Sequence, residues 1–436
     1  MTGYSAAGSY QGYRQTSTNR LAKPHFDVPL LLFTYALAIF GLVAITVAAY
    51  SPSSDTGLVK TLFARIMQSR DAQKQGIFLL VSPIIISAVL SIDYRFLGNA
   101  LFANLLFYGA CGFLVLAAVT GTDVNNVRGW MKLLYDYTVQ PAELAKLAVI
   151  VRLAQLLSRK ENPIASFMDF VRVALVLAIP VGLIVVAGEM GSAVVFIFFF
   201  MVMLLIAGVD SRVLFGIILG GAGMLVPLLL VMRKAGGYRY NRLLGFFLPS
   251  AATDSVKYQQ QNSIRAVGSG GLYGQGLFKS DSLTSLNFVP EKTNDFIFSS
   301  IGETMGFIGS IALLILYLLL VMRMVTLAIH TQDKFGQLII VGVLSMVMYH
   351  IFQGVGMAIG LMPVMGIPLP FVSYGGSNLT LNMASIALVL NVTMRKPQLA
   401  LTVAPPPRGN ARLAKRAARE RSNRQRGRAM IDQNRT

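Results

Sequence analysis

The sequence predicts an all-α polytopic membrane protein that crosses the bilayer about ten times. Of its 436 residues, 54% are hydrophobic and only 13% are charged, which is more hydrocarbon than a soluble core needs. Crossing roughly 30 Å of hydrocarbon takes a helix of about 20 apolar residues. Ten runs of this kind are predicted, at residues 28–50, 76–92, 100–120, 141–157, 171–188, 191–209, 213–232, 296–322, 337–361 and 378–394.

The charge distribution predicts the orientation of these spans. An even number of spans puts both ends on one side, and the basic C-terminal segment assigns that side to the cytoplasm by the positive-inside tendency. We therefore expect a cytoplasmic N-terminal segment at 1–27, a transmembrane domain at 28–395 and a basic, disordered cytoplasmic tail at 396–436. The first run is longer than a signal-peptide core, so it is expected to stay as an anchor. A cell membrane, crossed several times with both termini in the cytoplasm, is the expected location.

The net charge of +19 raises the question of a nucleic-acid partner. The tail that carries much of this charge has no aromatic residue to stack on a base, which argues against nucleic acid. Anionic lipid headgroups would attract it, at roughly 1 kcal/mol per basic residue near the surface. The alternative is a solvated tail that only sets the topology.

The number and positions of the cysteine and histidine residues exclude some kinds of site. The single cysteine, Cys111, lies in the third run, so an intrachain disulfide and a cysteine metal site are excluded. His25, His330 and His350 lack the spacing of metal ligands on a helix face, and each is expected to be structural.

Two ionisable residues open the fourth run, in the segment Gln140-Pro141-Ala142-Glu143-Leu144-Ala145-Lys146. An ionisable group inside a span costs about 2.5 to 3.5 kcal/mol on insertion scales, so it needs an explanation. Glu143 and Lys146 are three residues apart and share a helix face. They form either a polar cleft that opens to the outside or a neutralised pair that makes the span tolerable.

A second acidic site lies where the loop 233–295, between the seventh and eighth spans, enters the membrane. At roughly 60 residues this external loop is too long for a simple connector. Asp295 is expected at the water–lipid boundary, where the helix dipole favours its ionised form and burial favours its protonated form. It is a candidate proton acceptor, or an ordinary acidic residue at a helix N-terminus. Glu303, deeper in the same span, needs a hydrogen-bond donor or a proton.

Glycine and proline mark two further segments. Residues 366–377, Gly-Ile-Pro-Leu-Pro-Phe-Val-Ser-Tyr-Gly-Gly-Ser, cannot form a regular helix, which leaves backbone groups available to a polar headgroup. The alternative is a rigid turn. Within the external loop, glycines at 268, 270, 271, 274 and 276 are expected to allow tight turns and close approach to a ligand.

These blocks together resemble the shape, elongation, division and sporulation family, which includes the RodA and FtsW proteins. The resemblance rests on Arg128-Gly129-Trp130 with residues 140–146, on Gly268-Ser269-Gly270-Gly271, on Pro290 to Phe298 with Gly302-Glu303, and on residues 366–377. Gly366-Ile367-Pro368 looks more like RodA than FtsW. The sequence departs from the family pattern at Asn294, at Thr304 and at Gly188-Glu189, where proline-aspartate is usual.

The resemblance implies an inverting glycosyltransferase that polymerises lipid II at the outer face of the cytoplasmic membrane, together with a class B penicillin-binding protein. It also implies that Asp295 is the catalytic base. The substrate-binding candidates are Arg128, Trp130, Glu143, Lys146, Glu291, Ser373, Tyr374, Gly375 and Gly376.

In this mechanism the departing diphosphate needs positive charge. Lys146, Arg128 or a divalent cation such as Mg²⁺ or Mn²⁺ are the candidates. A lateral opening between helices must admit the lipid tail. Two rival functions stay open. One is a lipid flippase or transporter, although no internal repeat is found, and the other is a non-catalytic scaffold for a penicillin-binding protein.

Overall fold

The computed structural model describes residues 26–50, 62–124, 127–132, 138–160, 163–217, 219–221, 223 and 254–395. The expectations for residues 1–25, for 233–253 and for the tail from residue 396 fall outside this part of the chain.

The described chain is helical, as predicted. Eight helices are long and apolar enough to cross a membrane: α1 (Val28–Ala48), α3 (Arg70–Ser91), α5 (Ala100–Thr120), α7 (Phe167–Ala187), α8 (Met190–Ala207), α12 (Ile297–Ile329), α13 (Lys334–Ala358) and α14 (Gly376–Met394). The others are α2 (Leu62–Gln68), α4 (Tyr94–Leu97), α6 (Pro141–Ser158) and α11 (Asp254–Ser269). The polytopic helical class is confirmed.

The predicted number of ten spans is not established by this count. The fourth predicted span coincides with α6, whose 18 residues include Glu143, Lys146 and Arg152, so its composition keeps it out of the eight apolar helices. The seventh, at 213–232, lies mostly outside the described residues, which show a helix at Ser211–Gly221.

Helix α13 is the most buried of the eight spans. It packs against α6, α8, α12 and α14, while α1 packs against α12 and α3 packs against α14. Helix α5 follows α3 in the chain but packs instead against α6 and α7. Two consecutive spans therefore belong to different parts of the bundle.

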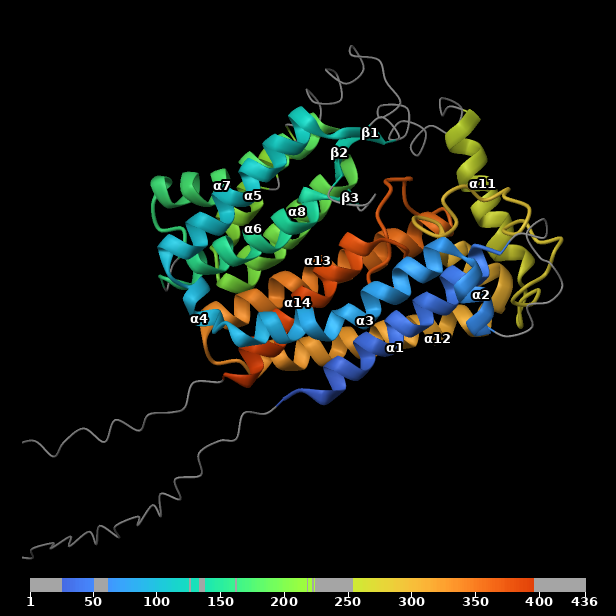
Figure 1. Ribbon diagram of the computed structural model, residues 1–436. Coiled ribbons are helices and arrows are strands. Elements are labelled where there is room, and N and C mark those ends of the chain that lie inside the picture. Colours follow the sequence, from blue (N-terminus) through green and yellow to red (C-terminus); the bar gives the residue numbers. More distant parts are fainter. Residues whose placement is uncertain are drawn as a thin grey trace, which may run out of the picture. The chain divides into compact units, whose positions relative to one another are not determined.

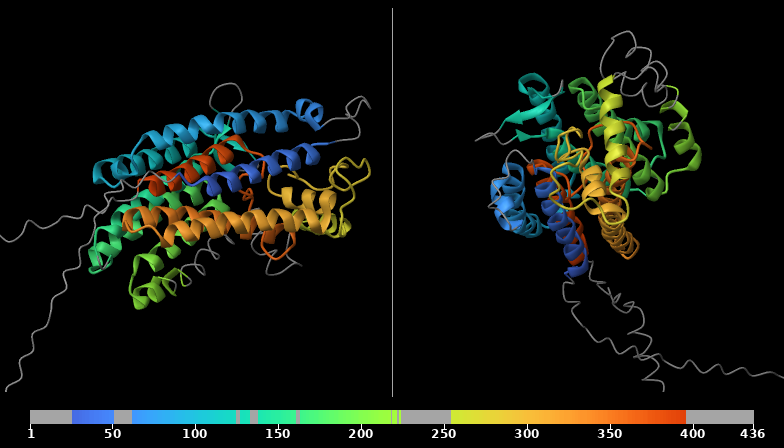
Figure 2. Two further views of the ribbon diagram at one scale, coloured as in Figure 1. Left: turned by 90° about the horizontal axis from the view of Figure 1, so that it is seen from below. Right: turned by 90° about the vertical axis from the view of Figure 1, so that its right-hand side faces the viewer.

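The bundle has two distinct ends (Figures 1 and 2). Helix α11 and the turns up to residue 296 lie at one end, here called the loop end. The beginning of α1 and the end of α14 lie at the other, the terminal end. At the terminal end, Arg323 of α12 pairs with Asp27, the N-cap of α1. Both described chain ends thus lie at the same end, as an even number of crossings requires.

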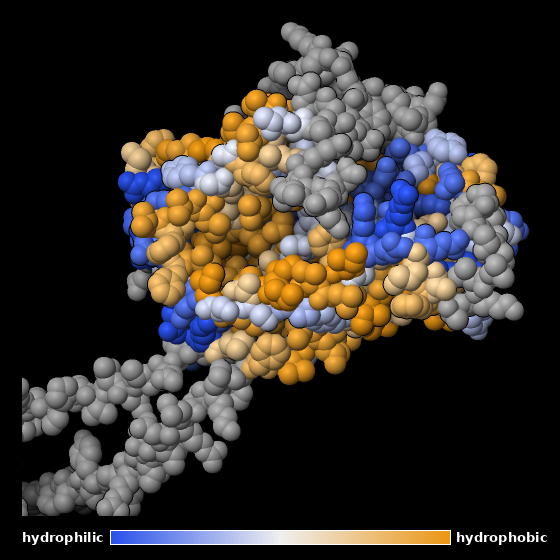
Figure 3. Space-filling model, in the orientation of Figure 1, coloured by the Kyte–Doolittle hydropathy of each residue, from blue (hydrophilic) through white to orange (hydrophobic). Residues whose placement is uncertain are grey.

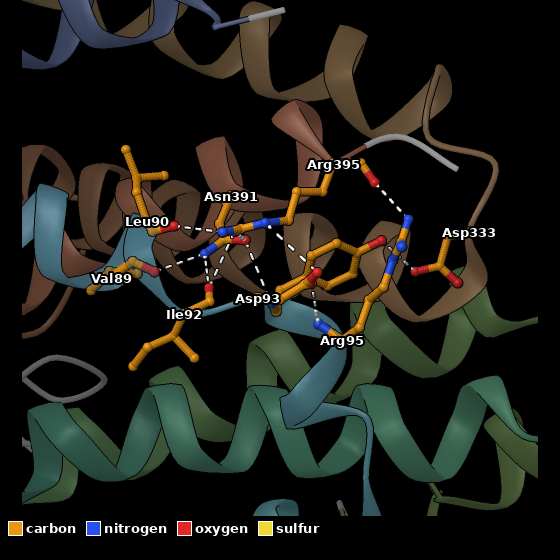
Figure 4. A network of polar contacts seen from close by, with 9 residues as sticks. Val89, Leu90, Ile92, Asp93, Arg95, Asp333, Asn391 and Arg395 are labelled. Carbon is orange, nitrogen blue, oxygen red and sulfur yellow. Dashed lines mark hydrogen bonds and ion pairs between the residues drawn. The ribbon is translucent and has the colours of Figure 1, made fainter. Parts of the chain in front are cut away.

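A polar network closes the terminal end (Figure 4). The last carbonyls of α3 have no partner within their own helix. Asn391 of α14 donates to the carbonyls of Val89 and Ile92, and Arg395 donates to those of Leu90 and Ile92. The last turn of α14 therefore caps the end of α3.

A small antiparallel sheet at the loop end was not predicted. Strands β1 (Thr122–Val124), β2 (Val127–Lys132) and β3 (Thr138–Val139) pair in the order β1-β2-β3. They lie between α5 and α6, in the segment that contains Arg128, Gly129 and Trp130. Strands of two to six residues are too short to show a clear alternating pattern. The sheet carries Trp130, which pairs with Thr122.

Two glycines of the external loop, Gly270 and Gly274, lie against α12, and Gly271, Gly274 and Gly276 have the positive φ of tight turns, as predicted. Helix α12 is broken at Gly306, whose φ of 67° and ψ of −162° are not helical. Residues 271–276 replace the missing helical hydrogen bonds: Gln275 N donates to the Glu303 carbonyl at 2.9 Å, and Phe307 N donates to the Gly271 carbonyl at 2.9 Å. A Cβ on Gly274 would overlap the α12 backbone.

The buried carboxylate of Glu303 also fastens the external loop. It accepts from the backbone N–H of Leu283 at 2.6 Å, from that of Thr284 at 2.8 Å, and from the Thr284 hydroxyl. The donors that Glu303 was predicted to need therefore come from the loop. An apolar cluster completes the contact between loop and bundle: Ala266, Val289, Phe296, Met357 and Val364.

Candidate functional site

A buried ionic cluster lies between α6 and α13. The Lys146 ammonium donates to Glu143 Oε1 at 2.6 Å and lies 3.0 Å from His350 Nε2 on α13. Lys146 is 1% exposed, Glu143 6% and His350 2%, so the cluster is within the bundle and not on its lipid face. The intrahelical pair, one of the two alternatives, is present, and it has a third member, His350, which was expected to be structural.

Glu189 adds a second carboxylate to this region. It occupies the turn between α7 and α8, and its Oε2 accepts from Gln140 Nε2 at 2.8 Å and from Ser192 Oγ at 3.2 Å. Its Oε1 is buried and has no hydrogen-bond partner. Burial raises the pKa of Glu189 to about 7, because removal from water disfavours the carboxylate; the Gln140 bond lowers it and the Glu143 charge raises it.

Asp295 lies at the loop end, two residues before α12 begins. The N-cap position belongs to Phe296, which makes no side-chain capping bond, so Asp295 is neither a helical residue nor the cap. Asp295 therefore lies just before the helix, and both alternatives, a proton acceptor and an ordinary acidic residue at a helix N-terminus, stay predictions. Its side chain is partly buried. Its Oδ2 would lie 3.3 Å from a Cβ on Gly366, a residue with a φ of 68°.

The segment 366–377 is a rigid turn that carries Asp295's neighbours. The Ser373 hydroxyl donates to the Asn294 carbonyl at 2.7 Å and accepts from Leu369 N at 2.9 Å, while Tyr374 N donates to the Thr293 carbonyl at 2.9 Å. Ser373 is fully buried. Its hydroxyl therefore holds the turn against residues 293–295. For Ser373, the structure agrees with the alternative in which residues 366–377 form a rigid turn.

The same turn is fastened to α3 and to the sheet. Gln75 of α3 accepts from Gly375 N at 3.3 Å and donates to the Ser373 carbonyl at 3.4 Å. Ser377 donates to the Thr138 carbonyl of β3 at 2.8 Å. A Cβ on Gly376 would overlap the ring of Phe78, so this glycine allows α14 to begin against α3.

One turn thus connects the two acidic regions. Gly191, two residues after Glu189, packs so closely on the turn that an added Cβ would lie 2.5 Å from the Met365 carbonyl. Gly366, the next residue in the chain, lies beside Asp295: a Cβ added to it would be 3.3 Å from Asp295 Oδ2. Asp295 and the Glu189 region are therefore held on either side of residues 365–367.

Glu291 belongs to a separate feature at the loop end. It is exposed and lines a cavity of about 440 Å³ together with residues of α1, of α3 and of its own loop: Ala49, Ser69, Arg70, Asp71, Asn287, Lys292 and Thr293. Burial lowers the pKa of Lys292 to about 8, and the charge of Glu303 opposes that shift. Lys292 also donates to the Thr284 carbonyl at 2.7 Å.

The predicted site residues thus fall into groups. Glu143 and Lys146 form the buried cluster, Asp295 lies against the turn of residues 366–377, Glu291 lines the outer cavity, and partly buried Trp130 lies on β2. The side chain of Arg128 is outside the described ones. The described residues contain no group of three or more His, Cys, Asp or Glu side chains that could hold a metal ion.

Sequence reasoning did not assign a role to three residues at this site. Glu189 was noted only as a departure from a family pattern, His350 was expected to be structural, and Gln75 fell just before a predicted span. The available signal was the same for each: a polar side chain inside or beside an apolar run is costly to bury.

Comparison with known proteins agrees with this architecture. The family model described as cell cycle protein, for FtsW, RodA and SpoVE, matches residues 28–398. A probable peptidoglycan glycosyltransferase FtsW of Geobacter sp. (strain M18) is 31% identical over 373 residues, which cover 85% of this chain and 97% of the relative. Stage V sporulation protein E of Bacillus subtilis (strain 168) is also 31% identical, covering 84% and 96%.

Two solved structures are similar as well. The rod shape determining protein RodA of Thermus thermophilus is 27% identical with a TM-score of 0.62, covering 87% of this chain and 99% of that one. A chain from a structure titled "Structural coordination of polymerization and crosslinking by a peptidoglycan synthase complex" is 27% identical with a TM-score of 0.69, covering 86% and 99%. The chain belongs to the shape, elongation, division and sporulation family, whose members include FtsW, RodA and SpoVE.

Proposed function

We propose that this chain is a peptidoglycan glycosyltransferase that polymerises lipid II at the outer face of the bacterial cytoplasmic membrane. The observation that carries the proposal is the position of Asp295: a partly buried carboxylate outside the helix, held against a rigid turn at the loop end. The FtsW relatives are named probable peptidoglycan glycosyltransferases, which supports the same activity.

Asp295 is the base in this reaction. The 4-hydroxyl oxygen of one disaccharide attacks the anomeric carbon of another, and the bond from that carbon to the diphosphate oxygen breaks. The hydroxyl proton passes to Asp295 and the electron pair leaves with the lipid diphosphate, so the anomeric configuration inverts. One positioned base contributes about a hundredfold to ten-thousandfold in rate.

The diphosphate leaving group is stabilised by positive charge. The Lys146 ammonium is the described cation of the cluster, and Arg128 is a second candidate from the sequence. Mg²⁺ or Mn²⁺ is a third, since Mg²⁺ is commonly held by one or two carboxylates together with substrate phosphates. The unpartnered Oε1 of Glu189 is an oxygen of that kind, and a cation bound there would neutralise diphosphate charge.

A hollow on the apolar surface offers a path for the lipid tail. In Figure 3 this hollow lies between α5 and α3, the consecutive helices that pack against different partners. Both helices carry exposed apolar side chains, among them Leu80 and Ile84 of α3 and Leu101 and Leu105 of α5. An isoprenoid chain could remain in the bilayer while its headgroup enters the loop end.

The proposed orientation places the loop end outside and the terminal end in the cytoplasm. It follows from the basic C-terminal segment and from the common position of Asp27 and Arg395. A class B penicillin-binding protein is the proposed partner, supported by the likeness to a chain of a peptidoglycan synthase complex. Membrane lipids are the other expected contact.

Purified protein, supplied with lipid II and its partner, tests the proposal. The wild type should produce glycan strands and Asp295→Asn should not, with unchanged thermal unfolding. Asp281→Asn is the matched control, because Asp281 is a 72% exposed carboxylate of the same loop. Synthesis by Asp295→Asn at the wild-type rate would favour the scaffold. Movement of lipid II between leaflets without polymerisation would favour the flippase.

A further inference from the structure

We propose that His350 is a positioning residue that holds the Lys146 ammonium toward the lipid diphosphate. This inference rests on the proposed function, because it assumes that Lys146 meets the leaving group. Nothing in the sequence pattern connects His350 with Lys146, since the two residues are 204 positions apart.

The hydrogen bonds of His350 fix which ring nitrogen carries the proton. An ammonium has three N–H donors and no acceptor, so His350 Nε2 must accept from Lys146 at 3.0 Å. Nδ1 then carries the hydrogen and donates to the Met346 carbonyl at 2.8 Å, one turn earlier on α13. Both ring nitrogens are satisfied by a single neutral form, and the ring cannot rotate without losing both bonds.

The cluster uses two of the three N–H groups of Lys146. Within the described part of the chain, the side chains that bond to Nζ are Glu143 and His350. Glu143 lies on the same helix as Lys146, whereas His350 lies on α13. The two acceptors therefore hold Nζ from two different helices, and the third N–H is left for an anionic group.

The depth of the cluster suits a headgroup that enters from the loop end. Lys146 is five residues after the start of α6 at Pro141, which places its Cα about 8 Å inside that end of the helix. His350 is eight residues before the last residue of α13, Ala358, or about 12 Å. Besides burial, the charges of Glu143 and Lys146 shift the pKa of Glu189 in opposite directions, so this carboxylate belongs to the same region.

Cohesion between α6 and α13 does not depend on this polar contact. Gly342 of α13 lies so close to α6 that an added Cβ would be 2.5 Å from Ile150 Cγ2, and Met203 of α8 closes the same contact. Buried ion pairs contribute little net stability, because desolvation offsets their attraction. Apolar packing therefore holds the helices together, and the geometry assigns His350 to the orientation of Lys146.

Substitutions of His350 separate these two roles. His350→Gln places an amide oxygen at about the reach of Nε2 and keeps an acceptor for Lys146, whereas His350→Leu removes it. His350→Asn places its oxygen nearer the position of Nδ1 and also leaves Lys146 without this acceptor. The matched control is Ser345→Ala, since Ser345 is 1% exposed on the same helix and bonds only to carbonyls of its own helix.

The readout is steady-state polymerisation of lipid II by the purified complex, with thermal unfolding of each variant. We expect His350→Leu and His350→Asn to lower kcat about tenfold to a hundredfold with KM within about twofold, because leaving-group stabilisation acts in the transition state. His350→Gln and Ser345→Ala should keep kcat within about threefold of the wild type. If His350→Leu does not fold, the comparison of His350→Asn with His350→Gln decides whether His350 orients Lys146.

Two results would overturn the inference. One is a wild-type kcat for His350→Leu or His350→Asn, and the other is an equal loss for Gln and Asn, which would assign the effect to the shape of the ring. Asp295→Asn, assayed in parallel, separates this inference from the proposed function. If Asp295→Asn is inactive while the His350 variants behave as wild type, only the role of His350 is wrong. If Asp295→Asn is active, the proposed function itself fails.

Discussion

Gly129 lies against the carboxylate of Glu189, so closely that a Cβ at position 129 would overlap Glu189 Oε1. Gly129 comes from β2 of the small sheet and Glu189 from the turn between α7 and α8. The glycine of the Arg128-Gly129-Trp130 block is thus explained by a close approach and not by a turn. Through this contact β2 packs on the buried carboxylate. The glutamate side chain is one methylene group longer than that of the aspartate that is usual in the family.

The first prediction concerns this contact. Gly129→Ala should displace the Glu189 carboxylate or push β2 away from it, because the methyl group has no space. We expect polymerisation to fall at least about tenfold, with a loss of about 1 to 3 kcal/mol in stability. Gly112→Ala on α5 is the control, because nothing lies within 4 Å of its added Cβ. Equal activity of Gly129→Ala and wild type would show that the approach is not needed.

The second prediction concerns pH. The pKa of Glu189 is raised to about 7 by burial, so the folded state holds this proton more tightly than the unfolded chain does. Stability should therefore fall as pH rises from about 4.5 to about 7, by about 3 kcal/mol at most, and remain low above that range. Glu189→Gln should remove this part of the pH dependence. The measurement is the thermal unfolding temperature of both proteins between pH 5 and pH 8, and parallel curves would contradict the prediction.

The third prediction concerns Glu303, which holds the external loop on α12. Leu283 N donates to Oε1 of Glu303 and Thr284 N to Oε2, so Glu303→Gln turns an N–H₂ group toward one of these two donors. The loss of acceptors for buried donors should cost about 1 to 3 kcal/mol. Limited proteolysis should then cut the segment 270–290 faster than in the wild type. Asp281→Asn, an exposed change in the same segment, should leave the rate unchanged, and an unchanged rate for Glu303→Gln as well would refute the anchoring role.

The helices and the ionisable residues inside them could be predicted from the sequence, since both depend on local composition. Glu143 and Lys146 were predicted to share a helix face because they are three residues apart, and they form an ion pair there. The short strands, the contact of Gly129 with Glu189 and the bond of Lys146 to His350 were not predictable. In each case the partners come from distant parts of the chain, and their meeting depends on how α6, α8 and α13 pack.

Asp295 has one property that the sequence predicts and one that it does not. Its sequence position predicts a carboxylate near the boundary of a span, and the structure places it at the loop end. Its exclusion from the helix depends on the turns of residues 291–296, in which Glu291 has a φ of 49° and Phe296 N donates to the Glu291 carbonyl at 3.2 Å. A conformation of this kind has no signature in hydrophobic periodicity.

The most direct test of the central claim is the initial rate at which the purified complex joins two molecules of lipid II when residue 295 is asparagine. Because an amide does not take up the hydroxyl proton, this rate should fall about a hundredfold or more while lipid II still binds. An Asp295→Asn protein that polymerises lipid II as fast as the wild type would contradict the account.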